Sequence, residues 1–304
     1  MAILYWFESI RTPALDTFFS LITHLGEETF FLVLALLIFW CIDKRQGYYL
    51  MAVGFGGTIL NQFLKLAFRI PRPWVRDPGF TIVEAARAEA TGYSFPSGHT
   101  QTAVGVYGGV ARSRGGWPRY AALALAVLIP ISRLYLGVHT LWDVGVAAVS
   151  SLLLLLVLWP LFQKYWSASR QPYGIFLALL VLAAAYTAYV SFWPFPADID
   201  PANYASGVKN AYTLLGASAG VLAVCWLDDR ILRFDTRAPL LGQVLKLVLG
   251  AALALGVKEG LKIALAAAMD GHPAAHAIRY FLVVLAVGGI WPATFPFFAK
   301  IGKR

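Results

Sequence analysis

Charged residues are scarce in this chain. They make up 13% of its 304 residues, whereas hydrophobic residues make up 59%, and the mean hydropathy is +0.66. A water-soluble globule of this size needs more polar side chains than that to cover its surface. The composition therefore argues against a soluble protein and favours one whose solvent is the lipid bilayer.

Cysteine is nearly absent as well. The two cysteines, Cys41 and Cys225, lie in or at the ends of apolar runs, and neither has a partner at metal-ligand spacing. We interpret both as structural.

The first 16 residues lack the basic start, long apolar core and small-residue cleavage site of a signal peptide, so we expect no cleavage.

Long apolar runs are abundant, and they lack the strict alternation of a membrane β-barrel. Because a helical crossing needs about 20 apolar residues, the fold class that we predict is all-α, a polytopic transmembrane helical bundle of nine crossings. The predicted crossings cover residues 27–43, 46–69, 99–113, 118–138, 139–163, 173–194, 204–227, 239–263 and 278–299. Before them, residues 12–26 form an amphipathic pattern too short to span, which predicts an interfacial helix.

The formal charge of +9 would suit nucleic acid, but we expect no such partner because no soluble domain carries a basic face. Membrane topology explains the charge better, since basic loops face the cytoplasm by the positive-inside rule. The basic loop residues are Lys44, Arg45, Arg112, Arg114, Arg119, Lys164, Arg170, Arg230, Arg233, Arg237, Lys300, Lys303 and Arg304. The segments 70–98, 195–203 and 270–277 and the turn near residue 138 are then predicted to face the extracytoplasmic side.

The first of three polar clusters on that side closes the second predicted crossing. Lys65 and Arg72 are two helical turns apart, so both can lie on one face until Pro71 and Pro73 end the regular structure. Two cations at an outer membrane edge suit an anion. Snorkelling of both side chains towards the headgroups is the alternative explanation.

The second cluster, residues 94–99, opens the third predicted crossing. A Pro-Ser-Gly run ahead of a helix leaves free backbone N–H groups, which favour a phosphate at the helix N-terminus. Gly98 allows close approach to the backbone, Ser97 can donate its hydroxyl, and His99 can exchange a proton near neutral pH. An ordinary capped helix start is the alternative.

The third cluster contains Ser132, Arg133, His139 and Asp143. The last two are i and i+4, so on a helix the carboxylate can accept a hydrogen bond from the imidazole. That bond fixes the tautomer and makes the other ring nitrogen a better nucleophile. Ionisable side chains inside apolar helices are costly unless they are used, which indicates a functional site.

In this order and spacing, the three clusters resemble the signature of the type 2 phosphatidic acid phosphatase superfamily, Lys-x6-Arg-Pro, Pro-Ser-Gly-His and Ser-Arg-x5-His-x3-Asp. Every position of the signature is present. The resemblance covers about residues 27–163, which we predict to be the catalytic helical core. It leaves the interfacial helix at 1–26 and additional C-terminal transmembrane helices at 164–304.

The resemblance implies a metal-independent, two-step phosphoryl transfer without a cofactor. By it, His139 attacks phosphorus, Asp143 orients and stabilises its imidazole, and His99 protonates the leaving oxygen and then activates water. The phosphate oxygens would be held by Lys65, Arg72, Ser97, the Gly98 N–H and Arg133. A metal site built from the two histidines and the aspartate is a rival, which the repulsion from three nearby cations disfavours.

The third predicted crossing is short. About 14 residues separate His99 from the basic Arg112 and Arg114, or roughly 21 Å of helix against a hydrocarbon core of ~30 Å. The pocket would therefore lie below the outer headgroups. That depth favours a lipid phosphate that enters sideways.

The second half of the chain places further cations toward the outer ends of its predicted helices, against the positive-inside tendency. They are Lys209, Lys258, Lys262 and Arg279, accompanied by Glu259. We predict that they bind a second anionic group of the substrate or line its route of access. Pairing with the glutamate and snorkelling are the alternative.

The predicted function is hydrolysis of the terminal phosphate of a lipid phosphate in the cell membrane. Phosphotransfer, and non-catalytic lipid-phosphate binding or transport, would use the same residues, although intact catalytic positions favour hydrolysis. Haloperoxidase chemistry occurs in soluble members of the superfamily, so the membrane spans disfavour it. The sequence leaves open the oligomeric state and the choice among phosphatidic acid, phosphatidylglycerol phosphate, a polyprenyl diphosphate and a sphingoid base phosphate.

Overall fold

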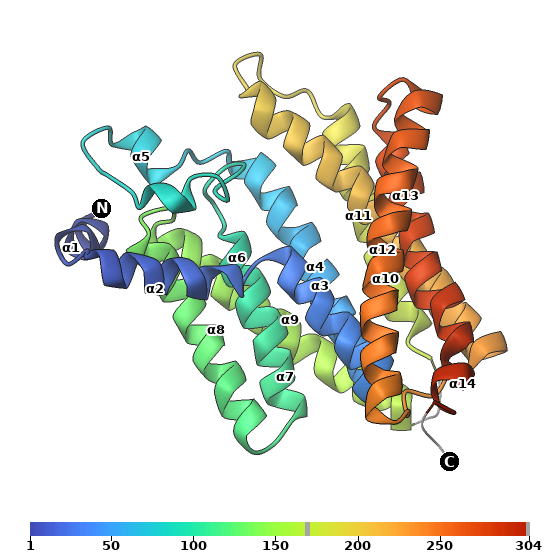
Figure 1. Ribbon diagram of the computed structural model, residues 1–304. Coiled ribbons are helices and arrows are strands. Elements are labelled where there is room, and N and C mark those ends of the chain that lie inside the picture. The colour runs from blue at the N-terminus through green and yellow to red at the C-terminus, as the bar shows by residue number, and fades with distance from the viewer. Residues whose placement is uncertain (168–170, 302–304) are drawn as a thin grey trace. The chain divides into compact units, whose positions relative to one another are not determined.

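The regular structure of the described residues is entirely helical (Figure 1), which confirms the all-α prediction. The computed structural model describes residues 1–167 and 171–301. Three of the basic loop residues, Arg170, Lys303 and Arg304, lie outside the described residues. No strand occurs within the described ranges.

The α-helices are α1 (Ala2–Ser9), α2 (Pro13–His24), α3 (Glu28–Leu37), α4 (Lys44–Phe68), α5 (Pro73–Arg76), α6 (Gly98–Thr102), α7 (Gly108–Ser113), α8 (Trp117–Tyr135), α9 (Leu141–Ser167), α10 (Tyr173–Phe192), α11 (Pro201–Leu227), α12 (Leu240–Met269), α13 (Ala274–Leu285) and α14 (Phe295–Phe298). Shorter helical turns are η1 (Ile38–Ile42), η2 (Glu84–Ala86), η3 (Ala103–Tyr107), η4 (Asp228–Leu232), η5 (Ala286–Ile290) and η6 (Trp291–Thr294). A π-turn, η3, joins α6 to α7.

The predicted count of nine crossings is not confirmed. Among the described residues, six helices are long and apolar enough to cross a membrane, or seven if α2 and the helix after it, which bend by 51°, cross as one. The third and fourth predicted crossings are helical but are not among these six. The first of them is short and glycine-rich, and the second, α8, carries Pro130, Ser132 and Arg133 in its last turns.

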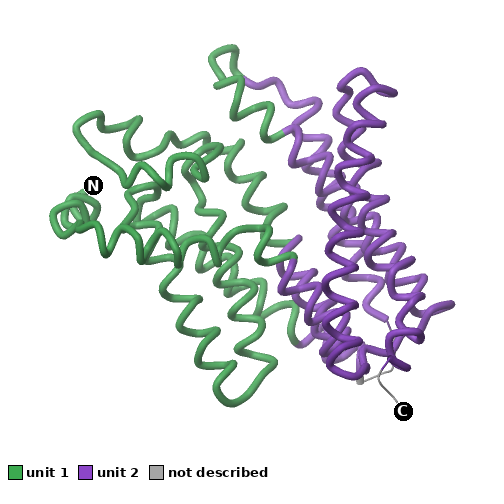
Figure 2. Tube along the Cα trace, in the orientation of Figure 1, with its two compact units in different colours: residues 1–32, 56–159, 196–207 green, residues 33–55, 160–195, 208–304 purple. Residues whose placement is uncertain are grey.

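The chain divides into two compact units, shown in green and purple in Figure 2. Unit 1 contains residues 1–32, 56–159 and 196–207, and unit 2 contains residues 33–55, 160–195 and 208–304. All three polar clusters of the sequence belong to unit 1. Several long helices, such as α4, begin in one unit and end in the other.

Helix α4 presents the first cluster. It ends at Phe68, where Arg69 adopts a left-handed conformation with φ of 50°. Lys65 lies in its last turn, and Arg72 is the residue just before α5, which starts with Pro73. Proline suits the first position of a helix and breaks a preceding one, so the two cations flank a fixed bend.

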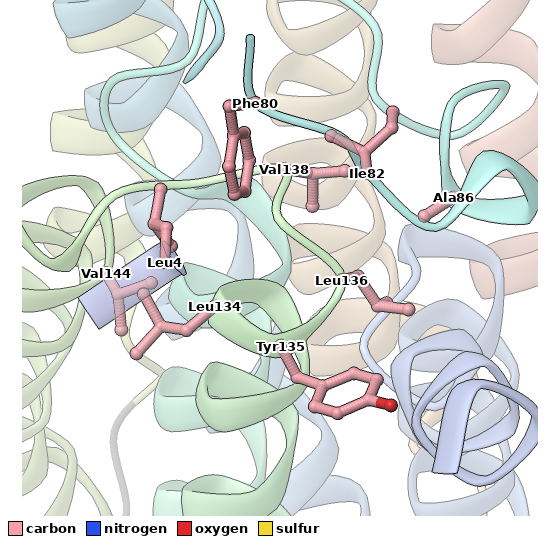
Figure 3. Packing of buried hydrophobic residues seen from close by; sticks show 9 residues of the cluster. All are labelled: Leu4, Phe80, Ile82, Ala86, Leu134, Tyr135, Leu136, Val138 and Val144. Atoms are coloured by element: carbon pink, nitrogen blue, oxygen red, sulfur yellow. The ribbon is translucent and has the colours of Figure 1, made fainter. Parts of the chain in front are cut away.

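A hydrophobic cluster surrounds the segment that carries the third polar cluster (Figure 3). It joins α1, the loop that follows α5, the end of α8 and the start of α9. Its members are Leu4, Phe80, Ile82, Ala86, Leu134, Tyr135, Leu136, Val138 and Val144. Because this packing surrounds the segment between α8 and α9, it fixes the backbone that carries His139.

The N-terminal segment contributes more than the sequence predicted. Helix α2 matches the predicted amphipathic helix, whereas α1 was missed. Between them, Arg11 donates hydrogen bonds to the carbonyl oxygen of Tyr135 at 3.1 and 3.3 Å and to that of Thr81 at 3.0 Å. The position of these helices at the membrane interface stays a prediction.

Unit 2 contains buried charges that have partners. Lys44, whose side chain is 27% exposed, has its Nζ 3.0 Å from both carboxylate oxygens of Asp228, whose side chain is fully buried. Lys246 is fully buried, and its Nζ donates to the carbonyl oxygens of Trp40 at 3.0 Å and Thr236 at 2.8 Å. Lys44 thus neutralises the buried carboxylate, whereas the carbonyl oxygens pair the Nζ of Lys246 without neutralising it.

Candidate active site

The three polar clusters meet around one cavity of about 270 Å³ in unit 1. Six of the predicted site residues line it, namely Lys65, Arg72, Gly98, His99, Arg133 and His139. Side chains more than 60 positions apart in the sequence therefore face a common space. The structure thus brings together the cations and histidines that the motifs singled out.

Arg72 is buried and held by backbone carbonyls. Its guanidinium donates to the carbonyl oxygens of Gly92 (3.1 Å), Thr91 (2.6 Å) and Val138 (3.1 Å). Lys65 Nζ likewise donates to the carbonyl oxygen of Tyr93. Carbonyl oxygens orient these cations without neutralising them, so the positive charge remains available to an anion.

His139 stands between Arg72 and Asp143. Its Nε2 lies 2.9 Å from Arg72 Nη1, and its Nδ1 lies 3.6 Å from Asp143 Oδ2. A guanidinium can only donate, so Nε2 is the unprotonated nitrogen and the ring proton is on Nδ1. The expected hydrogen bond to the carboxylate is not formed at 3.6 Å, and Nδ1 has no partner among the described residues. The nitrogen with the lone pair is therefore the one beside Arg72.

The surroundings of His139 keep its imidazole uncharged. The residue lies in the loop between α8 and α9 and is 2% exposed. Burial, followed by the positive charges of Arg72 and Arg133, holds the pKa of His139 well below its usual range. A neutral imidazole is the form that can act as a nucleophile.

Asp143 is fixed from several sides. Its Oδ2 accepts hydrogen bonds from Ser94 Oγ at 2.6 Å and from the backbone N–H of Thr140 at 2.7 Å. Its backbone carbonyl accepts from the N–H of Ser97 at 3.0 Å. The second and third clusters are therefore tied together through this one residue.

The turn before α6 combines a cap with a cavity wall. Ser97 Oγ accepts a hydrogen bond from the N–H of Thr100 at 3.3 Å, so it caps the helix, as the alternative reading of this cluster expected. Gly98 and His99 line the cavity, whereas Ser97 is not among its lining residues. Contact of Ser97 with a phosphate stays a prediction.

Arg133 is fully buried, yet much of its guanidinium is unused. Nη1 donates to Thr23 Oγ1 at 2.7 Å, whereas Nε and Nη2 have no hydrogen-bond partner among the described residues. Unpaired buried donors are costly and point to a ligand that completes them. Lys65, Arg72 and Arg133 thus bring three cations to one cavity, which suits a phosphate dianion.

The predicted second anion site lies on helices of unit 2. Lys258 and Lys262 are 3.6 and 3.9 Å from carboxylate oxygens of Glu259, consistent with the pairing alternative. Arg279 is buried and contacts His276 Nδ1 at 3.1 Å. Lys209 is the fourth residue of the set, on α11. A role in substrate binding or access stays a prediction.

A metal centre is not evident from the donor groups. Within residues 1–167 and 171–301, no three His, Cys, Asp or Glu side chains gather so that they could hold a metal ion.

Sequence reasoning missed several residues of the cavity. Asn61 is 2% exposed and lines it, one helical turn before Lys65 on the same face of α4, a spacing that could have revealed it. Glu89 lines it from the loop between α5 and α6, and Thr23, from α2, orients Arg133. The last two come from segments whose proximity no local pattern encodes.

Comparison with known proteins finds two family models along the chain. Residues 45–167 match the PAP2 superfamily, and residues 212–303 match the transmembrane extension of PAP2 superfamily phosphatases. The first match contains the three clusters, and the second covers most of the C-terminal helices.

Individual relatives agree with these models. The chain is 28% identical to dihydrosphingosine 1-phosphate phosphatase C823.11 of Schizosaccharomyces pombe, over 64% of this chain and about half (50%) of that protein. It is 33% identical to phosphatidylglycerophosphatase B of Bacillus subtilis, over 44% of this chain and 69% of that protein.

A solved structure is also similar. The crystal structure of a transmembrane PAP2-type phosphatidylglycerolphosphate phosphatase from Bacillus subtilis shares 30% identity, with a TM-score of 0.46, over 54% of this chain and 84% of that one. The family models and the sequence relatives carry the assignment. The chain belongs to the PAP2 superfamily.

Proposed function

We propose that this protein is an integral membrane phosphatase that removes the terminal phosphate of a lipid phosphate through a phosphohistidine on His139. The observation that carries the proposal is the placement of one imidazole between a carboxylate and an anion site. Nε2 faces Arg72 at 2.9 Å and Nδ1 faces Asp143 at 3.6 Å. The family's relatives are named as phosphatases of lipid phosphates, which supports it.

In the first step, the lone pair of His139 Nε2 attacks phosphorus, and the bond between phosphorus and the ester oxygen breaks. The leaving alkoxide takes a proton from His99. Burial and the positive charge of Arg133 hold the pKa of His99 well below its usual range, and the bound phosphate dianion offsets these effects and stabilises the imidazolium that donates this proton. The phosphorylated imidazole, still protonated on Nδ1, is cationic and is stabilised by Asp143. Lys65, Arg72 and the unpaired donors of Arg133 hold the charge on the equatorial oxygens.

In the second step, His99 Nε2 accepts a proton from a water molecule as the oxygen of that water attacks phosphorus. The N–P bond breaks, inorganic phosphate leaves, and His139 recovers its lone pair. His99 suits this role because it lines the cavity and its Nε2 has no hydrogen-bond partner among the described residues. Atoms and charge balance without a metal or a redox cofactor.

On this proposal, the part of the substrate that carries the phosphate is an apolar lipid. The protein is an apolar helical bundle, and its relatives are named for phosphates of lipids. The basic residues of the opposite loops support an active site on the extracytoplasmic side of the cell membrane. Both the site's depth and this orientation favour substrate that arrives from the outer leaflet.

The test is phosphate release from a panel of lipid phosphates in detergent with EDTA, comparing wild type with His139→Ala. We expect release by the wild type and its loss in the folded variant. Turnover that needs added metal ions, or that survives in His139→Ala, would overturn the mechanism. Transfer of phosphate to another lipid or a sugar without free phosphate would identify a phosphotransferase. Binding without either product would identify a carrier.

A further inference from the structure

The cavity is lined by a second set of charged groups, which differ chemically from the cations that would bind phosphate. Opposite in charge to the cations, the carboxylates Glu27, Glu28 and Glu89 also line it. A bare phosphate has no use for such groups, because like charges repel. Their presence calls for a positively charged or hydrogen-donating group on the same substrate.

Asn61 supplies an independent sign of such a group. Its Nδ2 donates to the carbonyl oxygen of Pro96 at 3.3 Å, so Oδ1 is the atom left for a ligand. That oxygen is buried in the cavity wall and has no hydrogen-bond partner among the described residues. An unpaired buried acceptor is costly unless a donor from the substrate completes it.

The acceptor lies close to the phosphate-binding turn. A Cβ atom at Gly98 would lie 3.8 Å from Asn61 Oδ1, so the amide oxygen is beside the backbone that approaches the phosphate. The donor it needs must therefore be only a few bonds from the phosphorus. Of the carboxylates, Glu89 makes no ion pair within residues 1–167 or 171–301, whereas Glu27 contacts His24.

We infer that the preferred substrates are long-chain amino alcohol phosphates, in which a protonated amine sits on the carbon next to the phosphate-bearing one. This deepens the proposed function and rests on it. The ammonium donates to Asn61 Oδ1 and is attracted by Glu89, while the cations hold the phosphate. Asn61 and Glu89 are then specificity-determining residues.

The other lipid phosphates fit this wall less well. Phosphatidic acid offers ester oxygens near its phosphate, which are acceptors and leave Asn61 Oδ1 unpaired. Phosphatidylglycerol phosphate and polyprenyl diphosphates bring a second negative phosphorus group, which the carboxylates repel. A site that pairs a substrate donor rejects analogues without it strongly.

The experiment compares kcat/KM for dihydrosphingosine 1-phosphate and for 3-hydroxyoctadecyl phosphate, which has the same chain and 3-hydroxyl but no amine. Wild type should favour the amine substrate by at least about tenfold. In Asn61→Leu this preference should fall roughly tenfold, whereas Asn61→Asp, which also loses the Pro96 bond but keeps an acceptor oxygen, should retain it. Glu89→Gln should weaken the preference by about threefold, since its carboxylate is exposed.

The matched control is Glu84→Gln, in the same loop between α5 and α6. Glu84 pairs with Arg87 at 2.7 Å and is not a cavity residue, so its variant should keep the wild-type preference. Equal turnover of both lipids by wild type, or a preference unchanged in both Asn61→Leu and Glu89→Gln, would overturn this inference alone. No phosphate release from either lipid would overturn the proposed function and this inference with it.

Discussion

Units 1 and 2 both bury charged side chains in an apolar chain, but the partners of these side chains differ. In unit 2, the buried Asp228 has the partly exposed Lys44 at 3.0 Å, and the buried Lys246 has two carbonyl oxygens within 3.0 Å. In unit 1, Arg72 faces a histidine, and Arg133 leaves two nitrogens without partners among the described residues. The partnered cations of unit 2 contribute to the fold, whereas the unpaired nitrogens of Arg133 are available to bind a ligand.

Burial alone does not identify a functional cation in this protein. Lys246 is as buried as Arg133, yet only the arginine borders a cavity that also holds two histidines. What distinguishes the site is unsatisfied hydrogen-bonding capacity directed at a common space. Arg279 is a partial exception in unit 2, because it contacts His276 while its Nε lacks a partner in the described part of the chain.

The largest expected effect is that of Arg133→Met. Because its unpaired nitrogens are assigned to the transition state, kcat should fall roughly 10²–10³-fold. The thermal unfolding temperature in detergent should not fall, since the variant removes a costly buried charge. Phosphate release measures the change in kcat, and thermal unfolding in detergent measures the change in unfolding temperature. Retained turnover would remove the distinction between the two units.

Lys44→Met should have the opposite profile. It leaves the Asp228 carboxylate buried without its cation, which should lower the free energy of unfolding by up to about 3 kcal/mol. Turnover per folded molecule should stay at the wild-type level. Denaturant unfolding and specific activity measure the two quantities, with Lys44→Arg as the control that keeps the charge. Lost turnover in folded Lys44→Met would contradict a purely structural role.

Gly137→Ala should have an intermediate effect. Gly137 has φ of 80°, and a Cβ there would lie 2.7 Å from Arg11 Nη2 and 2.9 Å from Phe80. The substitution should strain the loop by about 1 kcal/mol and, by displacing His139, lower kcat roughly tenfold. Gly115→Ala, where no atom lies within 4 Å of the added Cβ, should leave kcat unchanged. Equal kcat values in the two variants would argue against positioning through this loop.

The smallest expected effect is that of Lys258→Ala. Its partner Glu259 is 3.6 Å away and both side chains are exposed, so the change in stability should stay below about 0.5 kcal/mol. KM should not change if pairing is all that Lys258 does. A raised KM for lipid phosphate, with kcat unchanged, would instead support the predicted second anion site.

The sequence predicted the helical class, and its motifs named cations and histidines that line one cavity. Helical spacing does not explain how either pair comes together, because α4 ends at Phe68, before Arg72, and α9 begins at Leu141, after His139. Apolar run length located the helices. Apolar run length did not determine the number of crossings. Residues 99–113 are helical but short, and α8 carries the polar residues Ser132 and Arg133 near its end, so neither is among the six candidate spans.

The residues that the sequence did not reveal act through tertiary contacts. Arg11 holds the carbonyl oxygen of Tyr135, 124 positions away, and Thr23 orients Arg133, 110 positions away. Asn61 is recognisable only once the partner of its Nδ2 and the cavity are known. Ser97 Oγ caps α6, and its contact with a phosphate stays a prediction. Such assignments depend on neighbours that local periodicity does not encode.

The most direct test of the central claim is to trap the phosphorylated enzyme. Wild type and His99→Ala would be mixed with lipid phosphate, quenched rapidly in alkali to preserve an N–P bond, and analysed by peptide mass spectrometry. We predict a phosphoryl group on His139 in wild type and its absence in His139→Ala. In His99→Ala the group should form and disappear more slowly than in wild type, because His99 acts in both steps. Phosphate release by wild type with no phosphorylated His139 peptide, or with the label on another residue, would contradict the account.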